Sequence, residues 1–173
     1  MSAEFDRLAT DYEELLKDPV RDYFAPGSEF FVRRKIDVLL AFARGIGADT
    51  RRQTWLDVGC GKGQLLRAGQ SHFAAVHGCD VSTAMMDDAR DLHVVAQTEP
   101  DRIPFADESV DWVTAVCVFH HVEPRDRGRL TAEIRRVLKP GGIFAMVEHN
   151  PLNPAVQLIV RRTPVDAHAI LLT

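Results

Sequence analysis

The sequence has few cysteines, no long apolar run and no excess of positive charge, and each shortage argues against a class of protein. Its three cysteines, Cys60, Cys79 and Cys117, form no C-x-x-C pair, so their spacing predicts neither a metal site nor a redox motif. The apolar runs are too short and interrupted for a signal peptide or a membrane span. The net charge of −4 provides no overall attraction to nucleic acid. We therefore expect a cytoplasmic protein with reduced thiols and with neither a membrane nor a nucleic-acid partner.

The length and composition fit one globular domain. A chain of 173 residues with 46% hydrophobic side chains can bury a core of ordinary size, and no repeat or low-complexity tract divides it. Apolar residues at three- and four-residue steps predict two helices at the start, over 3–17 and 28–44. We expect a helical cap over residues 1–47, a core over 50–150 and a short final segment over 151–173.

The most informative residues are 54–63, where an apolar strand runs into a glycine-rich turn, Asp57-x-Gly59-x-Gly61-x-Gly63. Glycines at alternate positions let the backbone turn sharply and bring its N–H groups against a ligand that a Cβ would push away. The turn of the ordinary dinucleotide fingerprint is kept free of negative charge. Asp57 beside this turn therefore suits a ligand that carries a positive charge.

The next predicted strand ends in a second acid. Residues 75–80 lead to Asp80, 17 residues beyond Gly63, and Val81 follows. A carboxylate about 20 residues past such a turn, at the tip of the second strand, is placed to accept hydrogen bonds from both ribose hydroxyls of a ligand. Asp80 can also be the start of a helix that Ser82 caps. The two interpretations are compatible, because the residue sits at a strand-to-helix turn in both.

Strands and helices alternate through the core. The predicted strands occupy 54–58, 75–80, 93–97, 110–118 and 143–149, and the predicted helices between them occupy 62–72, 82–91 and 125–138. Alternation of this kind implies parallel strands and right-handed crossovers. The sequence therefore predicts an α/β fold with a Rossmann-like, doubly wound, mostly parallel sheet behind two N-terminal helices.

Four motifs in a fixed order lie between residues 50 and 150. Besides the glycine-rich turn and Asp80, the stretch 101–111 (DRIPFADESVD) precedes the fourth strand, and 137–144 (VLKPGGIF) leads into the fifth. Together they resemble the class I S-adenosylmethionine-dependent methyltransferases, in particular small-molecule enzymes of the type 11 and type 12 groups. The resemblance implies S-adenosylmethionine as cofactor, S-adenosylhomocysteine as product and a small-molecule methyl acceptor as partner.

The family fold implies the sheet order 3-2-1-4-5, followed by a further helix and by strands six and seven. Residues 150–173 are too few for these elements, so we expect a version of the fold that is truncated after strand five. Strand five would then be an open, apolar edge, which tends to recruit another strand. We expect either that residues 169–172 fold back onto this edge or that a second copy pairs with it in a homodimer.

The resemblance places the cofactor across the carboxyl ends of the first, second and fourth strands. The implied cofactor-binding residues are Tyr12, Asp57, Gly59, Cys60, Gly61, Gly63, Asp80, Val81, Glu99, Asp101 and Cys117. Glu99, and after it Asp101, aligns with the acid that meets the adenine amino group. Pro100 departs from the family pattern because it has no N–H to donate to the ring. Tyr12 resembles a lid residue over the cofactor, with packing on a helix face as the equal alternative.

Two histidines after the fourth strand are the candidates for catalysis. His121, beside His120, aligns with a histidine that acts in some small-molecule methyltransferases, whereas in many relatives the pair only shapes the pocket. Transfer from an activated sulfonium needs a base only where the acceptor must lose a proton, and an imidazole can be that base at neutral pH.

Three functions are compatible with these residues to different degrees. The leading hypothesis is methyl transfer from S-adenosylmethionine to a small-molecule oxygen or nitrogen acceptor. The second is a non-catalytic module that binds S-adenosylmethionine or S-adenosylhomocysteine, because the shortened C-terminus would leave the acceptor site open. An NAD-dependent oxidoreductase is disfavoured by the acid in front of the glycine-rich turn.

Overall fold

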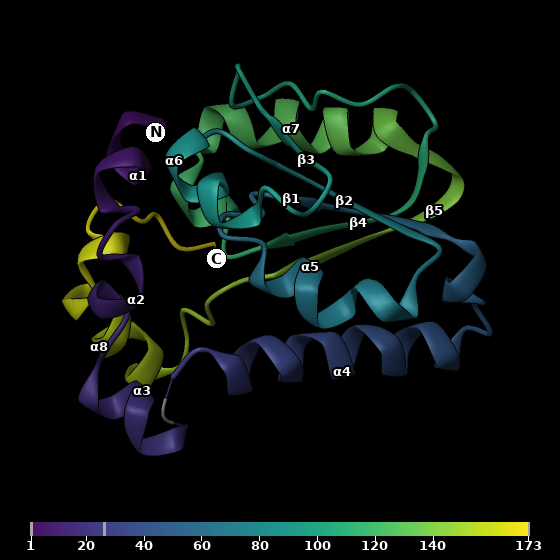
Figure 1. The fold of residues 1–173 in the computed structure, drawn as a ribbon. Helices are drawn as coiled ribbons and strands as arrows, with labels where there is room; N and C mark the ends of the chain where they lie inside the picture. Colours follow the sequence, from purple (N-terminus) through teal and green to yellow (C-terminus); the bar gives the residue numbers. More distant parts are fainter. Residues whose placement is uncertain (1, 26, 173) are drawn as a thin grey trace.

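The centre of the protein is a five-stranded parallel sheet. The computed structural model describes residues 2–25 and 27–172. Of the predicted segments, only Met1, Pro26 and Thr173 lie outside the described residues. The strands, listed along the chain, are β1 (Thr54–Val58), β2 (Ala75–Asp80), β3 (Val94–Ala96), β4 (Val110–Val116) and β5 (Leu138–Val147). Each strand is parallel to its neighbours, in the order β3-β2-β1-β4-β5 (Figure 1). The predicted fold class and strand order are confirmed.

Helices cover both faces of the sheet. On one face α4 (Glu29–Gly45) and α5 (Gln64–Gly69) enclose a core around the fully buried Trp55 and Trp112. On the other face α7 (Pro124–Val137) packs its apolar stripe over β1 and β4. Figure 1 shows α7 and the α4–α5 pair on opposite sides of the strands. This two-sided covering explains why the central strands are apolar on both faces.

The N-terminal segment differs from the two predicted helices. The first predicted helix is divided into α1 (Ser2–Leu8) and α2 (Tyr12–Leu15), and a further helix, α3 (Pro19–Phe24), precedes α4. Asp18 starts α3 by accepting hydrogen bonds from the backbone N–H groups of Val20 (2.8 Å) and Arg21 (3.3 Å), with Pro19 in the first turn. An acid before a proline is a helix-start signal that the apolar periodicity alone does not reveal.

Two of the predicted core helices are shorter in the structure. The segment predicted as 62–72 consists of α5 and a 3₁₀ turn, η2 (Gln70–His72), and the segment predicted as 82–91 consists of α6 (Thr83–Met86) and η3 (Asp87–Ala89). Other 3₁₀ turns are η1 (Thr50–Arg52) before β1 and η4 (Phe119–His121) after β4. The side chain of Ser82 accepts a hydrogen bond from the Met85 N–H, as expected of an N-cap.

The C-terminal segment turns back toward the carboxyl end of the sheet. After β5 it forms α8 (Pro154–Arg162) and η5 (Pro164–Asp166), and α8 lies against α3 while η5 lies against α2 (Figure 1). The Ile170 N–H then donates to the carbonyl oxygen of His120 over 2.7 Å, and Leu172 packs against the same core cluster as Phe144 of β5. Residues 169–172 thus return to the region of β5 without pairing with it, and the homodimer through this edge stays a prediction.

The β5 strand lies at one edge of the sheet, next to β4. It starts at Leu138, five residues before the predicted start, and its pairing with β4 shifts register between Val110 and Trp112.

Within the described chain, none of the helices has the length and apolar character that crossing a membrane requires.

Candidate functional site

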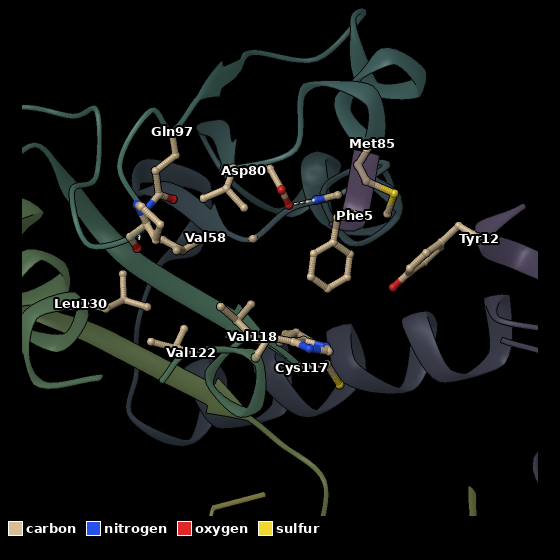
Figure 2. Close-up of a pocket in the computed structure, with 16 residues that line it drawn as sticks. Phe5, Tyr12, Val58, Asp80, Met85, Gln97, Cys117, Val118, Val122 and Leu130 are labelled. Carbon is tan, nitrogen blue, oxygen red and sulfur yellow. Dashed lines mark hydrogen bonds between the residues drawn. The ribbon is translucent and has the colours of Figure 1, made fainter. Parts of the chain in front are cut away.

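A cavity lies at the carboxyl ends of β1, β2 and β4, where the strand order reverses along the chain. This is the position at which open α/β sheets bind ligands. Figure 2 shows its walls, with Asp80 and Met85 on one side, Val118 and Val122 on the other, and Phe5 between them. The lining residues are Phe5, Tyr12, Val58, Gly59, Gly61, Asp80, Val81, Met85, Gln97, Pro100, Val116, Cys117, Val118, His121, Val122 and Leu130.

The glycine-rich turn contributes backbone to this cavity. Gly59, Gly61 and Gly63 all have positive φ angles, of 72°, 49° and 71°, which side-chain-bearing residues rarely adopt. A Cβ on Gly59 would also lie 2.5 Å from Val118 Cγ2. Gly59 and Gly61 line the cavity, whereas Gly63 packs against Ala89 and starts α5. Gly59 and Gly61 therefore let a ligand come close to the backbone, whereas Gly63 lets α5 pack closely against its neighbour.

Asp80 joins the two loops that face the cavity. Its Oδ2 accepts a hydrogen bond from the Gly61 N–H and its Oδ1 accepts one from the Ser82 N–H, each over 2.8 Å. Burial raises the pKa of Asp80, while these backbone bonds act in the opposite direction. A carboxylate has about four lone-pair positions. The positions that backbone donors leave free can accept hydrogen bonds from donors in the cavity, which Asp80 and Val81 both line.

Asp57 and Cys60 lie behind the cavity wall. Asp57 is 3% exposed, and its Oδ1 accepts a hydrogen bond from Thr114 Oγ1 over 2.5 Å, while Thr114 Oγ1 accepts one from Trp55 Nε1 over 2.8 Å. Burial raises the pKa of Asp57 to about 7. Cys60 is buried beneath Gly78. In this structure Asp57 connects β1 to β4 instead of reaching the cavity, and its contact with a ligand ammonium stays a prediction.

The loop after β3 presents different residues from those expected. Glu99 is exposed, and Asp101 accepts a hydrogen bond from Arg129 Nη1 over 3.1 Å; neither lines the cavity. Gln97 and Pro100 line it instead, and Gln97 Nε2 donates to the carbonyl oxygen of Pro100 over 2.9 Å. The assignment of Glu99 and Asp101 to the adenine ring stays a prediction. Gln97, buried at the tip of β3, was not predicted, because an acidic residue was expected in this loop and the glutamine side chain is uncharged.

The N-terminal helices cover the cavity. Phe5, from α1, places its ring in the cavity and contacts the ring of His121 edge-on at 4.9 Å (Figure 2). Asp6 holds α1 in place by accepting a hydrogen bond from Ser82 Oγ over 2.6 Å. Tyr12 also lines the cavity, and burial raises its pKa. With both side chains inside, the cavity has a volume of about 120 Å³.

Cys117, at the end of β4, has an unusual backbone conformation. Its φ angle is 58°, in the left-handed region that costs a residue with a side chain roughly 1–2 kcal/mol. The Cys117 N–H donates to the carbonyl oxygen of Val147 over 2.8 Å, which fixes the turn between β4 and η4. Strained residues of this kind cluster at ligand sites. Cys117 lines the cavity, and η4 with the two histidines follows this turn.

The two predicted catalytic histidines have different environments. His121 lines the cavity, whereas His120 lies behind it with a fully buried side chain. Glu148 accepts hydrogen bonds from the N–H groups of Val118 and Phe119, and His120 Nδ1 lies 2.5 Å from its other oxygen. Although burial disfavours the imidazolium, Asp166 and Glu148 raise the pKa of His120 to about 9. Burial, and then the charge on His120, lower the pKa of His121 to about 4.

A family model described as a methyltransferase domain matches residues 56–146, more than half of the chain. The chain belongs to this methyltransferase family. The resemblance seen in the sequence motifs is therefore confirmed, and with it S-adenosylmethionine as the cofactor of the family. The cavity is lined by glycine backbone, apolar side chains and one carboxylate, a lining that fits a ligand with both hydroxyl and cationic groups.

Known methyltransferases resemble the chain over different lengths. The 2-methyl-6-phytyl-1,4-hydroquinone methyltransferase of Synechocystis is 30% identical over 166 residues, which is 84% of this chain and 52% of that protein. The tRNA (carboxymethyluridine(34)-5-O)-methyltransferase of Arabidopsis thaliana is 29% identical over 114 residues, or 65% of this chain and 28% of that protein. The chain thus spans about half the length of the first relative and about a quarter of the second.

A solved methyltransferase shares the fold along the whole chain. The S-adenosylmethionine-dependent methyltransferase from Thermotoga maritima superposes with a TM-score of 0.69 and 20% identity, covering 100% of this chain and 75% of that one. At this identity the likeness concerns the methyltransferase fold alone.

Proposed function

We propose that the chain binds S-adenosylmethionine across the carboxyl ends of β1, β2 and β4 and transfers its methyl group to a small-molecule oxygen or nitrogen acceptor. The observation that carries this proposal is the junction of the glycine-rich turn with Asp80. One Asp80 oxygen holds the Gly61 N–H, and both loops face one cavity. The pairing of a glycine-rich turn with an acid at the next strand tip is suited to a ribose-containing ligand.

Entry of a whole cofactor requires the N-terminal helices to move outward. Small-molecule sites have volumes of roughly 300–1,000 Å³, and the present cavity has about 120 Å³. Phe5 and Tyr12 line the cavity from the α1–α2 side, where α1 contacts α6 and α2 contacts η5. We assign α1 and α2 as a lid, in agreement with the family role expected of Tyr12.

One wall of the cavity is apolar. Val116, Val118, Val122 and Leu130 form its wall together with the edge of His121. An enclosed apolar wall suits a small molecule better than a polyanion, and the net charge of −4 acts in the same direction. The resemblance to a hydroquinone methyltransferase extends over 166 residues and the resemblance to a tRNA methyltransferase over 114. These observations favour a small-molecule acceptor.

The cofactor, when bound, supplies a methyl group on an activated sulfonium. The chain's own residues orient the reacting groups and exclude water. Asp80 and the backbone of Gly59 and Gly61 orient the nucleoside part, and closure of Phe5 over the cavity excludes water. Holding the reacting groups in line in this way provides most of the acceleration that such a displacement needs. His121 is the polar side chain placed to contact the acceptor.

The proposal is tested by binding and turnover measured separately. Calorimetry with S-adenosylmethionine and S-adenosylhomocysteine should give binding of one molecule per chain. The protein should then transfer a radiolabelled methyl group to a low-molecular-weight fraction of a cell extract and leave the tRNA fraction unlabelled. Labelled tRNA would overturn the acceptor assignment. Tight S-adenosylhomocysteine binding with no labelled product in any fraction would identify a binding module instead of an enzyme.

A further inference from the structure

Three imidazoles and two carboxylates gather at the end of the cavity opposite Asp80. They come from separate parts of the chain: η4 supplies two histidines, the residues after β5 supply a glutamate and a histidine, and η5 supplies an aspartate. The five residues are His120, His121, Glu148, His149 and Asp166. The fold of the C-terminal segment over η4 brings them together, and methyl transfer as proposed above uses only the edge of His121.

The ligand atoms of three of these residues surround one point. Asp166 Oδ1 lies 3.4 Å from His120 Nε2 and 3.5 Å from His121 Nε2, and the three atoms all lie within 4.8 Å of one another. His120 Nε2 is a buried nitrogen without a hydrogen-bond partner among the described residues, on a side chain that is fully buried. Buried polar atoms are nearly always satisfied, so this nitrogen calls for a partner.

The spacing matches the ligand shell of a tetrahedral cation. Zinc binds imidazole nitrogen and carboxylate oxygen at about 2.0–2.1 Å, which separates two ligands of a tetrahedron by about 3.3–3.4 Å. The two distances to Asp166 Oδ1 are close to this value, and the ligand atoms of the two histidines lie within 4.8 Å of each other.

A further carboxylate orients one of these histidines from behind. Metal-binding histidines usually donate their other ring N–H to a carboxylate or a carbonyl. Glu148 is in that position, 2.5 Å from His120 Nδ1, and is itself fixed by the Val118 and Phe119 N–H groups. A proton on Nδ1 leaves the lone pair of Nε2 free to bind a cation.

We propose that His120, His121 and Asp166 bind one divalent cation, with Zn²⁺ as the favoured ion. Imidazole and carboxylate ligands in a tetrahedral spacing select zinc among the common biological cations. His149 Nε2 lies 3.7 Å from Asp166 Oδ2 and stays outside the group of three, so it holds the carboxylate and leaves a fourth position for water or substrate. Because His121 lines the cavity, this position is next to it. The sequence did not predict the site, since its ligands share no local spacing.

The simpler explanation is that Asp166 only neutralises a protonated His120. Zinc titration of the chelator-treated protein, with a competing chromogenic chelator and with metal analysis after gel filtration, separates the two. We expect one Zn²⁺ per chain, and Co²⁺ in its place should give the strong visible absorption of a tetrahedral site. Glu148→Gln should weaken zinc binding by roughly 10–100-fold, and His121→Asn and Asp166→Asn should weaken it by more.

The matched control is His168→Asn, which removes a histidine that is 81% exposed and lies outside the cluster. Zinc should raise the melting temperature of the wild type and of this control, because a ligand that binds only the folded state stabilises it. Zinc should leave the melting temperature of a folded His121→Asn variant unchanged. Equal zinc content in wild type and His121→Asn, or no retained zinc in a folded wild type, would overturn the proposal. Neither readout depends on methyl transfer, so a failure here leaves the proposed function intact.

Discussion

Replacing Asp80 by asparagine tests the cofactor site at the residue that joins its two loops. The side chain keeps its size and one carbonyl oxygen, but it loses its charge and half of its acceptor positions. Asp80 is 9% exposed, so solvent screens its interactions only weakly. Hydrogen bonds to a charged acceptor contribute roughly 1.5–3 kcal/mol each and neutral ones roughly 0.5–1.5 kcal/mol. With two ribose hydroxyls as donors, the loss should be about 2 kcal/mol, or roughly 30-fold in affinity.

The assay is calorimetric titration with S-adenosylhomocysteine, because the product analogue binds without reacting. The control is Asp87→Asn, which removes the same charge from the surface of η3, where the side chain pairs with Arg90. Circular dichroism should show that both variants keep the fold, since Asp80 also accepts two backbone hydrogen bonds. Equal affinities of wild type and a folded Asp80→Asn variant would refute the ribose assignment.

Three further predictions concern the turn, the buried acid and the lid. Gly61→Val should lose more than about tenfold in cofactor affinity, whereas Gly141→Val, which also has a positive φ but open space around it, should bind normally by calorimetry. Because burial raises the pKa of Asp57 from 3.8 to about 7, the folded protein should lose stability as the pH rises through this window, since the unfolded chain gives up the proton first. Asp57→Asn should remove that loss in urea unfolding, and parallel pH profiles would contradict the assignment. Phe5→Ala should speed cofactor association in stopped-flow measurements, and Phe30→Ala, 54% exposed on α4, should not; equal rates would mean that the lid does not limit entry.

The central part of the fold could be predicted because its signals are local. The strands 54–58 and 75–80 were predicted with the bounds that β1 and β2 have, since each is an apolar run that ends at an acid or a glycine. The division of the first helix was not predictable from periodicity. The apolar spacing of this helix continues across residues 9–11. In the structure the chain divides there, because α1 places Phe5 in the cavity while α2 packs against η5.

The site could be predicted where its residues belong to a sequence motif, including Tyr12, Cys117 and His121, which lie apart in the sequence and also line the cavity. Gly59, Gly61 and Asp80 belong to one β-α-β unit, and they line one cavity. Asp166 was not predicted as a site residue, because nothing around it in the sequence indicates that it faces His120 and His121. Such a contact is set by the path of α8 and η5 and carries no periodic or spacing signal.

The lid and the histidine cluster have a consequence for how acceptors diverge within the family. The family model covers residues 56–146, and so it includes every residue that lines the cavity except Phe5 and Tyr12, and it also leaves out Asp166. The two terminal segments, which carry these three residues, contact each other through α2 with η5 and α3 with α8. We expect that they can be exchanged between relatives as a pair without loss of cofactor binding. Chimeras that carry both segments of another methyltransferase would report which compound each pair of ends selects.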